Sequence, residues 1–170
     1  MEASNDRTPG FEPAAGSSTE DASATAGWPR KVLLASDGSK HADRAAEVLA
    51  AFVPSGATVR LLTVAGLEFA PYEGRWGPLS DEPERQARLQ SLIENAFDLP
   101  LQNLKKTDCQ IEKSTRFGNP AEQIMEEIRE WQPDLVVVGR AGVGGVVKLL
   151  LGSVSEHVVK HAKVPVLVVP

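Results

Sequence analysis

Three glycines and a serine form a spaced pattern that begins at the end of the apolar segment VVVG, residues 136–139. Gly139 and Gly142 have two residues between them, and Gly152–Ser153 follows after nine more, which gives Gly-x2-Gly-x9-Gly-Ser. Glycine lets backbone N–H groups approach a ligand closely, and GSVS predicts a helix N-terminus with free N–H groups and two hydroxyls, which favours anions. The pattern predicts two walls of a site for a di- or triphosphate. Alternatively, the glycines serve only tight turns and Ser153 only caps its helix.

The glycine pattern matches neither of two common phosphate-binding motifs. A P-loop places Lys and then Ser or Thr after its last glycine, whereas Gly145 precedes Val146 and Val147. A dinucleotide-binding fingerprint that starts at Gly142 requires a third glycine where Val147 stands, and it opens a fold rather than following a late strand. Both motifs are excluded, and with them a Walker lysine for phosphoryl transfer.

A second polar segment, SDGS at residues 36–39, follows the first apolar segment of the chain. The carboxylate of Asp37 can accept hydrogen bonds from ribose hydroxyls or hold a phosphate-bound Mg²⁺ ion. The alternative is that Asp37 caps the helix that follows, a role that Ser39 can take instead. The three histidines form no metal-binding set, and no general base for attack on a γ-phosphate can be named. No catalytic residue is therefore predicted.

Apolar segments that alternate with amphipathic ones position these motifs. Strands are expected at residues 31–36, 58–64, 109–114, 134–139 and 164–169, the third of them weak like an edge strand. Helices are expected over about 42–53, 89–96, 120–131 and 153–161, with Pro100 breaking or kinking the second and Ser153 capping the fourth. This order predicts an α/β fold with a five-stranded parallel sheet and helices on both faces, flavodoxin-like or Rossmann-like. Ligands bind such sheets at the carboxyl ends of the strands, which both polar motifs follow.

The composition of the chain changes near residue 28. Residues 1–27 contain few apolar side chains to offset the entropy of ordering, so they are expected to form a disordered tail. Residues 30–170 are expected to form a single domain. Within it, a long loop at residues 65–83 is rich in glycine and proline. Its aromatic residues Phe69, Tyr72 and Trp76 can cover a bound base or pack against a partner.

The charge distribution argues against nucleic acid and membrane partners. The net charge of −5 divides into −3 for residues 1–30 and −2 for the remainder, without a basic stripe. No apolar run approaches the roughly 20 residues that span a bilayer, and the acidic N-terminus lacks the apolar segment of a secretory signal. Cys109 is the single cysteine and cannot form an internal disulfide, which favours the reducing cytoplasm as the location.

The glycine motif and its flanking segments resemble the universal stress protein family. The resemblance rests on VLLASDGS, GNPAEQI, PDLVVVGRAG and the C-terminal GSVSEHVVKHAKVPVLVV, and it covers about residues 30–170. It implies a homodimer and, for members with this glycine motif, binding of ATP. The backbone at Val64 is implied to contact adenine, and Thr63 precedes it where a histidine is common. The nucleotide-binding residues expected from the motifs and the resemblance are Ser36, Asp37, Val64, Gly139, Arg140, Gly142, Gly152, Ser153, Val154 and Ser155.

The function expected from these observations is that of an ATP-binding universal stress protein. It would act as a nucleotide-dependent regulatory module in the stress response, with at most slow ATP hydrolysis and with a downstream protein partner that the sequence does not name. Two alternatives stay open: an ATP-using hydrolase or adenylyl-type transferase on the same fold, and an interaction protein that binds no nucleotide. The last strand, residues 164–169, is apolar on both faces and is expected at an edge of the sheet. The resemblance implies that it pairs antiparallel with its copy in a homodimer.

Overall fold

Strands and helices alternate throughout the part of the chain that the structure describes. This computed structural model describes residues 28–66, 83–141 and 151–170. The tail expected at 1–27 lies outside these ranges, as do Gly142 and most of the loop with Phe69, Tyr72 and Trp76. The strands are β1 (Lys31–Ala35), β2 (Thr58–Ala65), β3 (Gln110–Phe117), β4 (Leu135–Gly139) and β5 (Val166–Val169), and the helices are α1 (Lys40–Ala50), α2 (Pro83–Leu104), α3 (Pro120–Trp131) and α4 (Ser153–His161).

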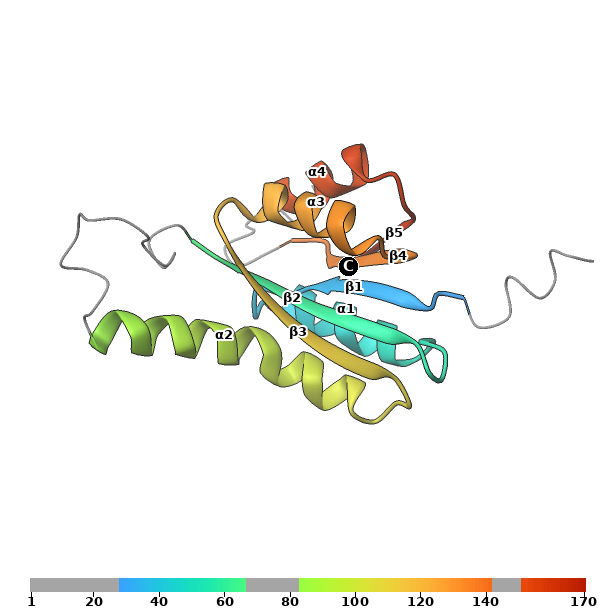
Figure 1. Cartoon of the computed structure of the whole chain (residues 1–170), viewed down its shortest axis with the longest axis horizontal. Coiled ribbons are helices and arrows are strands. Elements are labelled where there is room, and N and C mark those ends of the chain that lie inside the picture. The colour runs from blue at the N-terminus through green and yellow to red at the C-terminus, as the bar shows by residue number, and fades with distance from the viewer. Residues whose placement is uncertain (1–27, 67–82, 142–150) are drawn as a thin grey trace, which may run out of the picture.

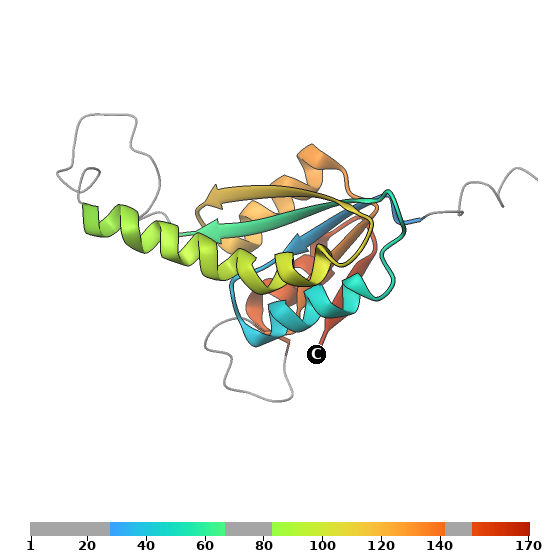
Figure 2. The same cartoon turned by 90° about the horizontal axis from the view of Figure 1, so that it is seen from below.

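The strands form one parallel sheet in the order β3-β2-β1-β4-β5. This arrangement confirms the predicted fold class. β1 pairs with β2 on one side and with β4 on the other, so the strand order reverses between β1 and β4. The arrowheads of β1, β2 and β3 point to the same edge of the sheet (Figure 2). Ala35 pairs with Val138, and therefore the segments that follow β1 and β4 leave the sheet side by side.

Helices cover both faces of the sheet (Figure 1). On one face, α1 and α2 contribute Leu49 and Phe97 to a core that includes Leu34 of β1. On the other face, α3 and α4 pack around Leu33 of β1. Leu33 and Leu34 are both 0% exposed, which explains why β1 is apolar at consecutive positions instead of alternating. The N-terminal part of α2 extends beyond the carboxyl ends of the strands in both views (Figures 1 and 2).

Helix α2 continues through Pro100 to Leu104. Of the expected break or kink at this proline, the break is therefore wrong. Proline has no N–H group, which leaves the carbonyl of Ala96, four residues earlier, without its helical donor. The hydroxyl of Ser36 donates to that carbonyl oxygen at 2.6 Å. A side chain at the end of β1 thus satisfies the helix at the point where proline weakens it.

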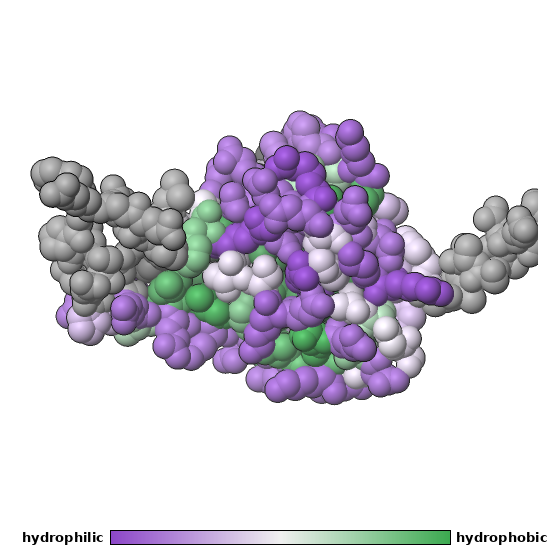
Figure 3. Space-filling model, viewed as in Figure 1, coloured by the Kyte–Doolittle hydropathy of each residue, from purple (hydrophilic) through white to green (hydrophobic). Residues whose placement is uncertain are grey.

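Both edge strands differ slightly from the expected ranges. β3 extends to Phe117 instead of residue 114 and pairs with β2 along its whole length. β5 begins at Val166 instead of residue 164. β3 and β5 are the two edges of the sheet, as predicted. Apolar side chains reach the surface along α2 (Figure 3). Leu99 of this helix is 48% exposed. Within the described ranges, no helix is long and apolar enough to cross a bilayer.

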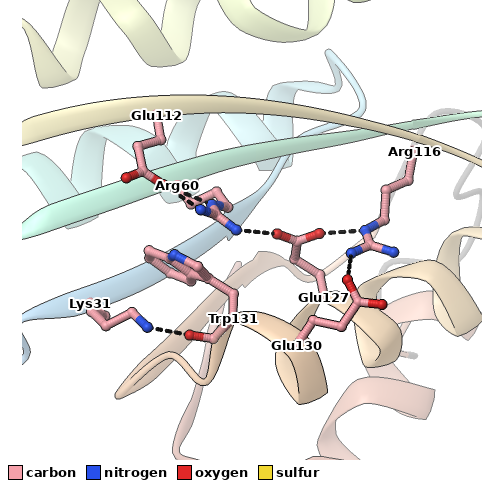
Figure 4. Close-up of polar contacts among 7 residues, drawn as sticks. All are labelled: Lys31, Arg60, Glu112, Arg116, Glu127, Glu130 and Trp131. Carbon is pink, nitrogen blue, oxygen red and sulfur yellow. Dashed lines mark hydrogen bonds and ion pairs between the residues drawn. The ribbon is translucent and has the colours of Figure 1, made fainter.

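A buried carboxylate joins α3 to two strands (Figure 4). Glu127 is 2% exposed, and its two oxygens accept hydrogen bonds from Arg60 of β2, at 2.8 Å, and from Arg116 of β3. Arg60 also pairs with Glu112, and Arg116 also pairs with Glu130. The alternating charges compensate the burial of Glu127, since a buried charge is tolerated only with such partners.

Trp131 lies at the margin of the core instead of inside it. Its ring has the ammonium of Lys31 at 4.6 Å and the guanidinium of Arg60 at 4.4 Å from the centroid. Both separations suit cation–π contacts. The side chain of Trp131 therefore lies between the end of α3 and the beginning of β1 and β2 (Figure 4).

Candidate functional site

A cleft lies where β1 and β4 end, at the point where the strand order reverses. Its volume of about 680 Å³ falls within the range of about 300–1,000 Å³ that is typical of small-molecule sites. Residues after β1 and at the end of β2 line it, together with residues from α2 and from the first turns of α3 and α4. This is the position at which open α/β sheets bind their ligands.

The cleft brings together eight of the ten residues expected to bind nucleotide. Arg140 is half-buried and is not among the residues that line the cleft, and Gly142 lies outside the described ranges. The eight that line the cleft are Ser36, Asp37, Val64, Gly139, Gly152, Ser153, Val154 and Ser155.

The N-terminus of α4 forms one end of the cleft. Gly152 is the N-cap and Ser153 is the first helical residue, so the capping box expected from Ser153 is wrong. The first intrahelical bond runs from the N–H of Glu156 to the carbonyl of Gly152 at 2.8 Å. The N–H groups of the three preceding residues have no acceptor within the helix, and Gly152 supplies no side-chain cap. The helix therefore presents main-chain donors and the positive end of its dipole at the cleft.

The carbonyl of Arg140 fixes the start of α4 to the end of β4. It accepts hydrogen bonds from the N–H of Gly152 and from the hydroxyl of Ser155, both at 2.8 Å. Ser155 is 3% exposed, and its hydroxyl also lies 2.9 Å from the carbonyl of Gly152. One of the two hydroxyls expected at the anion site is thus engaged with the main chain. Ser155 positions the helix start, whereas Ser153 is exposed.

Gly139 is required by packing against α1. A Cβ atom at this position would lie 2.7 Å from the carbonyl carbon of His41 and 2.9 Å from the backbone nitrogen of Ala42. A Cβ atom at Gly152 would lie 3.2 Å from both the Cα of Ala141 and the carbonyl oxygen of Arg140. At both positions glycine permits two backbone segments to approach each other closely. The sequence pattern had instead suggested that these glycines let the backbone approach a ligand.

Asp37 and Ser39 share the turn between β1 and α1. Ser39 is the N-cap of α1, and its hydroxyl accepts a hydrogen bond from the N–H of Ala42 at 3.2 Å. Asp37 accepts a hydrogen bond from the N–H of Ser39 at 3.0 Å, and its side chain is exposed at the cleft. Ser39 therefore caps α1, and the alternative that Asp37 caps this helix is wrong. Burial and, secondly, the charge of Asp37 raise the pKa of Asp43, one turn into α1.

The end of the cleft near β2 is mainly apolar. Val64 from β2, Leu92 from α2 and Ile124 from α3 line it. Thr63 also lines this end and is 1% exposed. The cleft thus joins a donor-rich end at α4 to an apolar end at β2, with Asp37 and the end of β1 between them.

The sequence model of the Universal stress protein family matches residues 29–170. The chain belongs to this family. A universal stress protein of Thermus aquaticus, from the QAH/OAS sulfhydrylase 3′ region, is 37% identical over 142 residues, which cover 82% of this chain and 98% of that protein. The solved structure of the hypothetical protein MJ0577 is similar, with a TM-score of 0.64 and 26% identity over 82% of this chain and 94% of its own. A universal stress protein solved in complex with cAMP has a TM-score of 0.54 and 26% identity, covering 82% of this chain and 95% of its own.

The cleft of this universal stress protein contains few ionisable groups. Of the described residues that line it, Asp37 alone carries an ionisable side chain. No group of three or more His, Cys, Asp and Glu side chains within the described ranges could hold a metal ion.

Proposed function

We propose that this universal stress protein binds ATP in the cleft and acts as a nucleotide-dependent regulatory module in the stress response. The observation that carries the proposal is the start of α4, whose first three residues line the cleft and whose N-cap, Gly152, provides no side-chain cap. A phosphate group would supply acceptors for the N–H groups of these residues, which have none within the helix, and the helix dipole favours its negative charge.

The two ends of the cleft suit the two ends of a nucleotide. The apolar side chains of Val64, Leu92 and Ile124 suit the faces of a base. Asp37, between the two ends, suits ribose hydroxyls or a Mg²⁺ ion that the phosphates also bind. In this arrangement the phosphates extend from β1 toward α4, and the base lies against β2.

A solved relative supports a nucleotide as the ligand. That universal stress protein, 26% identical to this chain, was determined in complex with cAMP. ATP shares the adenine base and the ribose of cAMP and differs in its chain of phosphates. The proposed preference for ATP over such a nucleotide rests on the N–H groups of α4.

Hydrolysis of the bound ATP is proposed to be slow at most. Asp37 is the one ionisable side chain among the described lining residues, and it lies in the turn before α1 rather than at the start of α4. A dedicated hydrolase or transferase would need groups that activate the nucleophile and neutralise the leaving group. A single-turnover assay with ATP should therefore show little product on the timescale of binding, and rapid turnover would favour the enzyme alternative.

Calorimetry on the full chain tests the proposal directly. ATP with Mg²⁺ should bind more tightly than AMP, because the N–H groups of α4 contact the outer phosphates. Equal affinity for the two nucleotides would remove the phosphate role from α4. Absence of binding to ATP and to AMP would favour the alternative of an interaction protein that binds no nucleotide.

A matched pair of variants at Ser153 isolates the main-chain donors. Ser153→Pro removes one N–H at the first helical position, where proline is well tolerated, and Gly152 already has the extended backbone that precedes proline (φ −65°, ψ 153°). Ser153→Ala removes the hydroxyl and keeps the N–H. We expect Ser153→Pro to weaken ATP binding by about tenfold, the value of one charge-assisted hydrogen bond, and Ser153→Ala to change it less. Equal affinities in the two variants would contradict this.

Assembly and location complete the proposal. β5 is an edge of the sheet, and an uncovered edge strand favours association with a second copy. We expect a homodimer in which two β5 strands pair antiparallel. The proposed compartment is the reducing cytoplasm, with a downstream protein that senses the nucleotide-bound form.

A further inference from the structure

Thr63 lines the cleft, and its buried hydroxyl has no hydrogen-bond partner among the described residues. The side chain of Thr63 is 1% exposed. Three buried serines line the same cleft, Ser36, Ser39 and Ser155. The hydroxyl of each forms a hydrogen bond with the main chain. Thr63 differs from them in that respect.

An unpaired buried hydroxyl costs stability, and the sheet offers a simple way to avoid that cost. Valine has the same shape as threonine and an equal or better preference for strands. Within β2, Val59 and Leu61 occupy the positions on the same face as Thr63 and belong to the core beneath α1 and α2. A buried polar atom in such a row therefore requires an explanation outside the fold itself.

The position of Thr63 indicates which part of a ligand it meets. Thr63 follows Leu62, which pairs with Ala35 at the end of β1, and it immediately precedes Val64 at the apolar end of the cleft. The donors of α4 lie beyond β1 and β4, at the opposite end. Rotation about χ1 exchanges the hydroxyl and the methyl group of threonine. The hydroxyl can therefore turn to a polar atom of a group that enters between β2 and α2.

We propose that Thr63 is a specificity-determining residue whose hydroxyl forms a hydrogen bond with the polar edge of the nucleotide base. The inference rests on the proposed nucleotide function, in which the base lies against β2, and adds the side chain of Thr63 to the groups that contact it. Main-chain groups at Val64 are then not the only groups of this strand that recognise the base. A threonine hydroxyl both donates and accepts, so it can pair with a ring nitrogen or with an exocyclic amino group.

The test compares Thr63→Val with Thr63→Ser in the full chain. Thr63→Val keeps the shape and removes the hydroxyl, whereas Thr63→Ser keeps the hydroxyl. Thr115→Val is a matched control, because Thr115 pairs with Thr63 in the β2–β3 register and is not among the residues lining the cleft. Calorimetry measures the affinity of each protein for ATP, adenosine and inorganic triphosphate, and thermal unfolding without ligand measures its stability.

We expect Thr63→Val to weaken ATP and adenosine by the same factor, about tenfold, and to leave inorganic triphosphate unchanged. Its melting temperature without ligand should be equal to or above that of the parent, because the unpaired hydroxyl is gone. Thr63→Ser and Thr115→Val should bind ATP and adenosine as the parent does. This combination of lower affinity and undiminished stability is not produced by a merely structural threonine.

Three outcomes would overturn the inference. Unchanged affinity of Thr63→Val for ATP would make Thr63 a packing residue, although ATP binding by the parent would keep the proposed function intact. An equal loss of inorganic triphosphate would show a general distortion of the cleft instead of a contact with the base. Failure of the parent chain to bind ATP and adenosine would overturn the proposed function and this inference together.

Discussion

Ser36 donates a hydrogen bond to the carbonyl oxygen of Ala96 at 2.6 Å, and Ala96 is the residue whose carbonyl Pro100 leaves without a helical donor. Ser36 also lines the candidate site. The same side chain thus completes α2 and forms part of the cleft wall. Any change that moves α2 is therefore expected to alter the cleft next to β1.

A double-mutant cycle on Ser36 and Pro100 measures this relationship. Ser36→Ala should lower the free energy of unfolding by about 1–3 kcal/mol, because the buried carbonyl of Ala96 loses its donor. Pro100→Ala restores an N–H four residues after Ala96, so Ser36→Ala in that background should cost clearly less. Urea denaturation of the four proteins gives the coupling energy. Costs that add within about 0.5 kcal/mol would show that the two residues act independently.

Gly139→Ala should destabilise the fold itself. The added methyl group would lie 2.7 Å from the carbonyl carbon of His41, so α1 or β4 must move. Overpacking of this kind costs about 1–3 kcal/mol of unfolding free energy. Gly152→Ala, where the nearest atoms are 3.2 Å away, should cost less in the same denaturation experiment. A Gly139→Ala protein of unchanged stability that no longer binds ATP would instead assign this glycine to ligand access.

Asp43→Asn should stabilise the protein at neutral pH. The Oδ1 atom of Asp43 is buried and has no hydrogen-bond partner among the described residues. Burial and then the charge of Asp37 raise the pKa of Asp43. An acid whose pKa is higher in the folded state destabilises the fold when it is ionised, so the cost is present above the folded pKa and disappears below the unfolded one.

The pH dependence of the melting temperature separates this effect from a general loss of charge. Asp43→Asn should melt above the parent at pH 7, and the difference should shrink as the pH falls through the raised pKa of Asp43 and disappear below the ordinary pKa of an aspartic acid. Glu122→Gln is the control, because Glu122 is an exposed acid in the first turn of α3 and benefits from the helix dipole. It should melt slightly below the parent at pH 7. A stabilised Glu122→Gln or a destabilised Asp43→Asn would contradict the assignment.

Proline substitutions at neighbouring positions of β5 test the proposed dimer. The carbonyls of Pro165 and Val169 accept hydrogen bonds from the N–H groups of Val136 and Arg140, so alternate residues of β5 face β4. The N–H of Leu167 consequently points to β4, and that of Val168 points to the open edge. Val168→Pro should favour the monomer while the fold persists, because proline is tolerated where the N–H faces outward.

Leu167→Pro is the matched control for that experiment. It removes an N–H that faces β4 and should lower the melting temperature. Light scattering coupled to size-exclusion chromatography should give about twice the chain mass of 18.2 kDa for the parent, and the mass of one chain for Val168→Pro. A monomeric parent at tens of micromolar would refute the β5 dimer, and a Val168→Pro dimer would move the contact to another surface.

The sequence determined the order and type of the elements, because apolar periodicity is a local property of the chain. Continuous runs such as those of β1 and β4 indicate strands buried on both faces, and the spacing of Ile124 and Ile128 indicates the helix α3. The topology rule for parallel sheets then placed the segments after β1 and β4 at one edge. Eight of the ten expected site residues line one cleft for this reason.

Tertiary structure decided the contacts that each of these residues makes, since those partners are distant in the sequence. Pro100 remains inside α2 because Ser36, 60 residues away from Ala96, replaces the missing donor. Glu127 occupies a position that helix periodicity leaves open, and its burial depends on Arg60 and Arg116 from two strands. Gly139 is small because α1 passes against it. The hydroxyl of Thr63 is buried without a partner among the described residues, which only the packed sheet reveals. Local patterns specify elements, whereas the pairing of buried polar atoms exists only once the elements have packed.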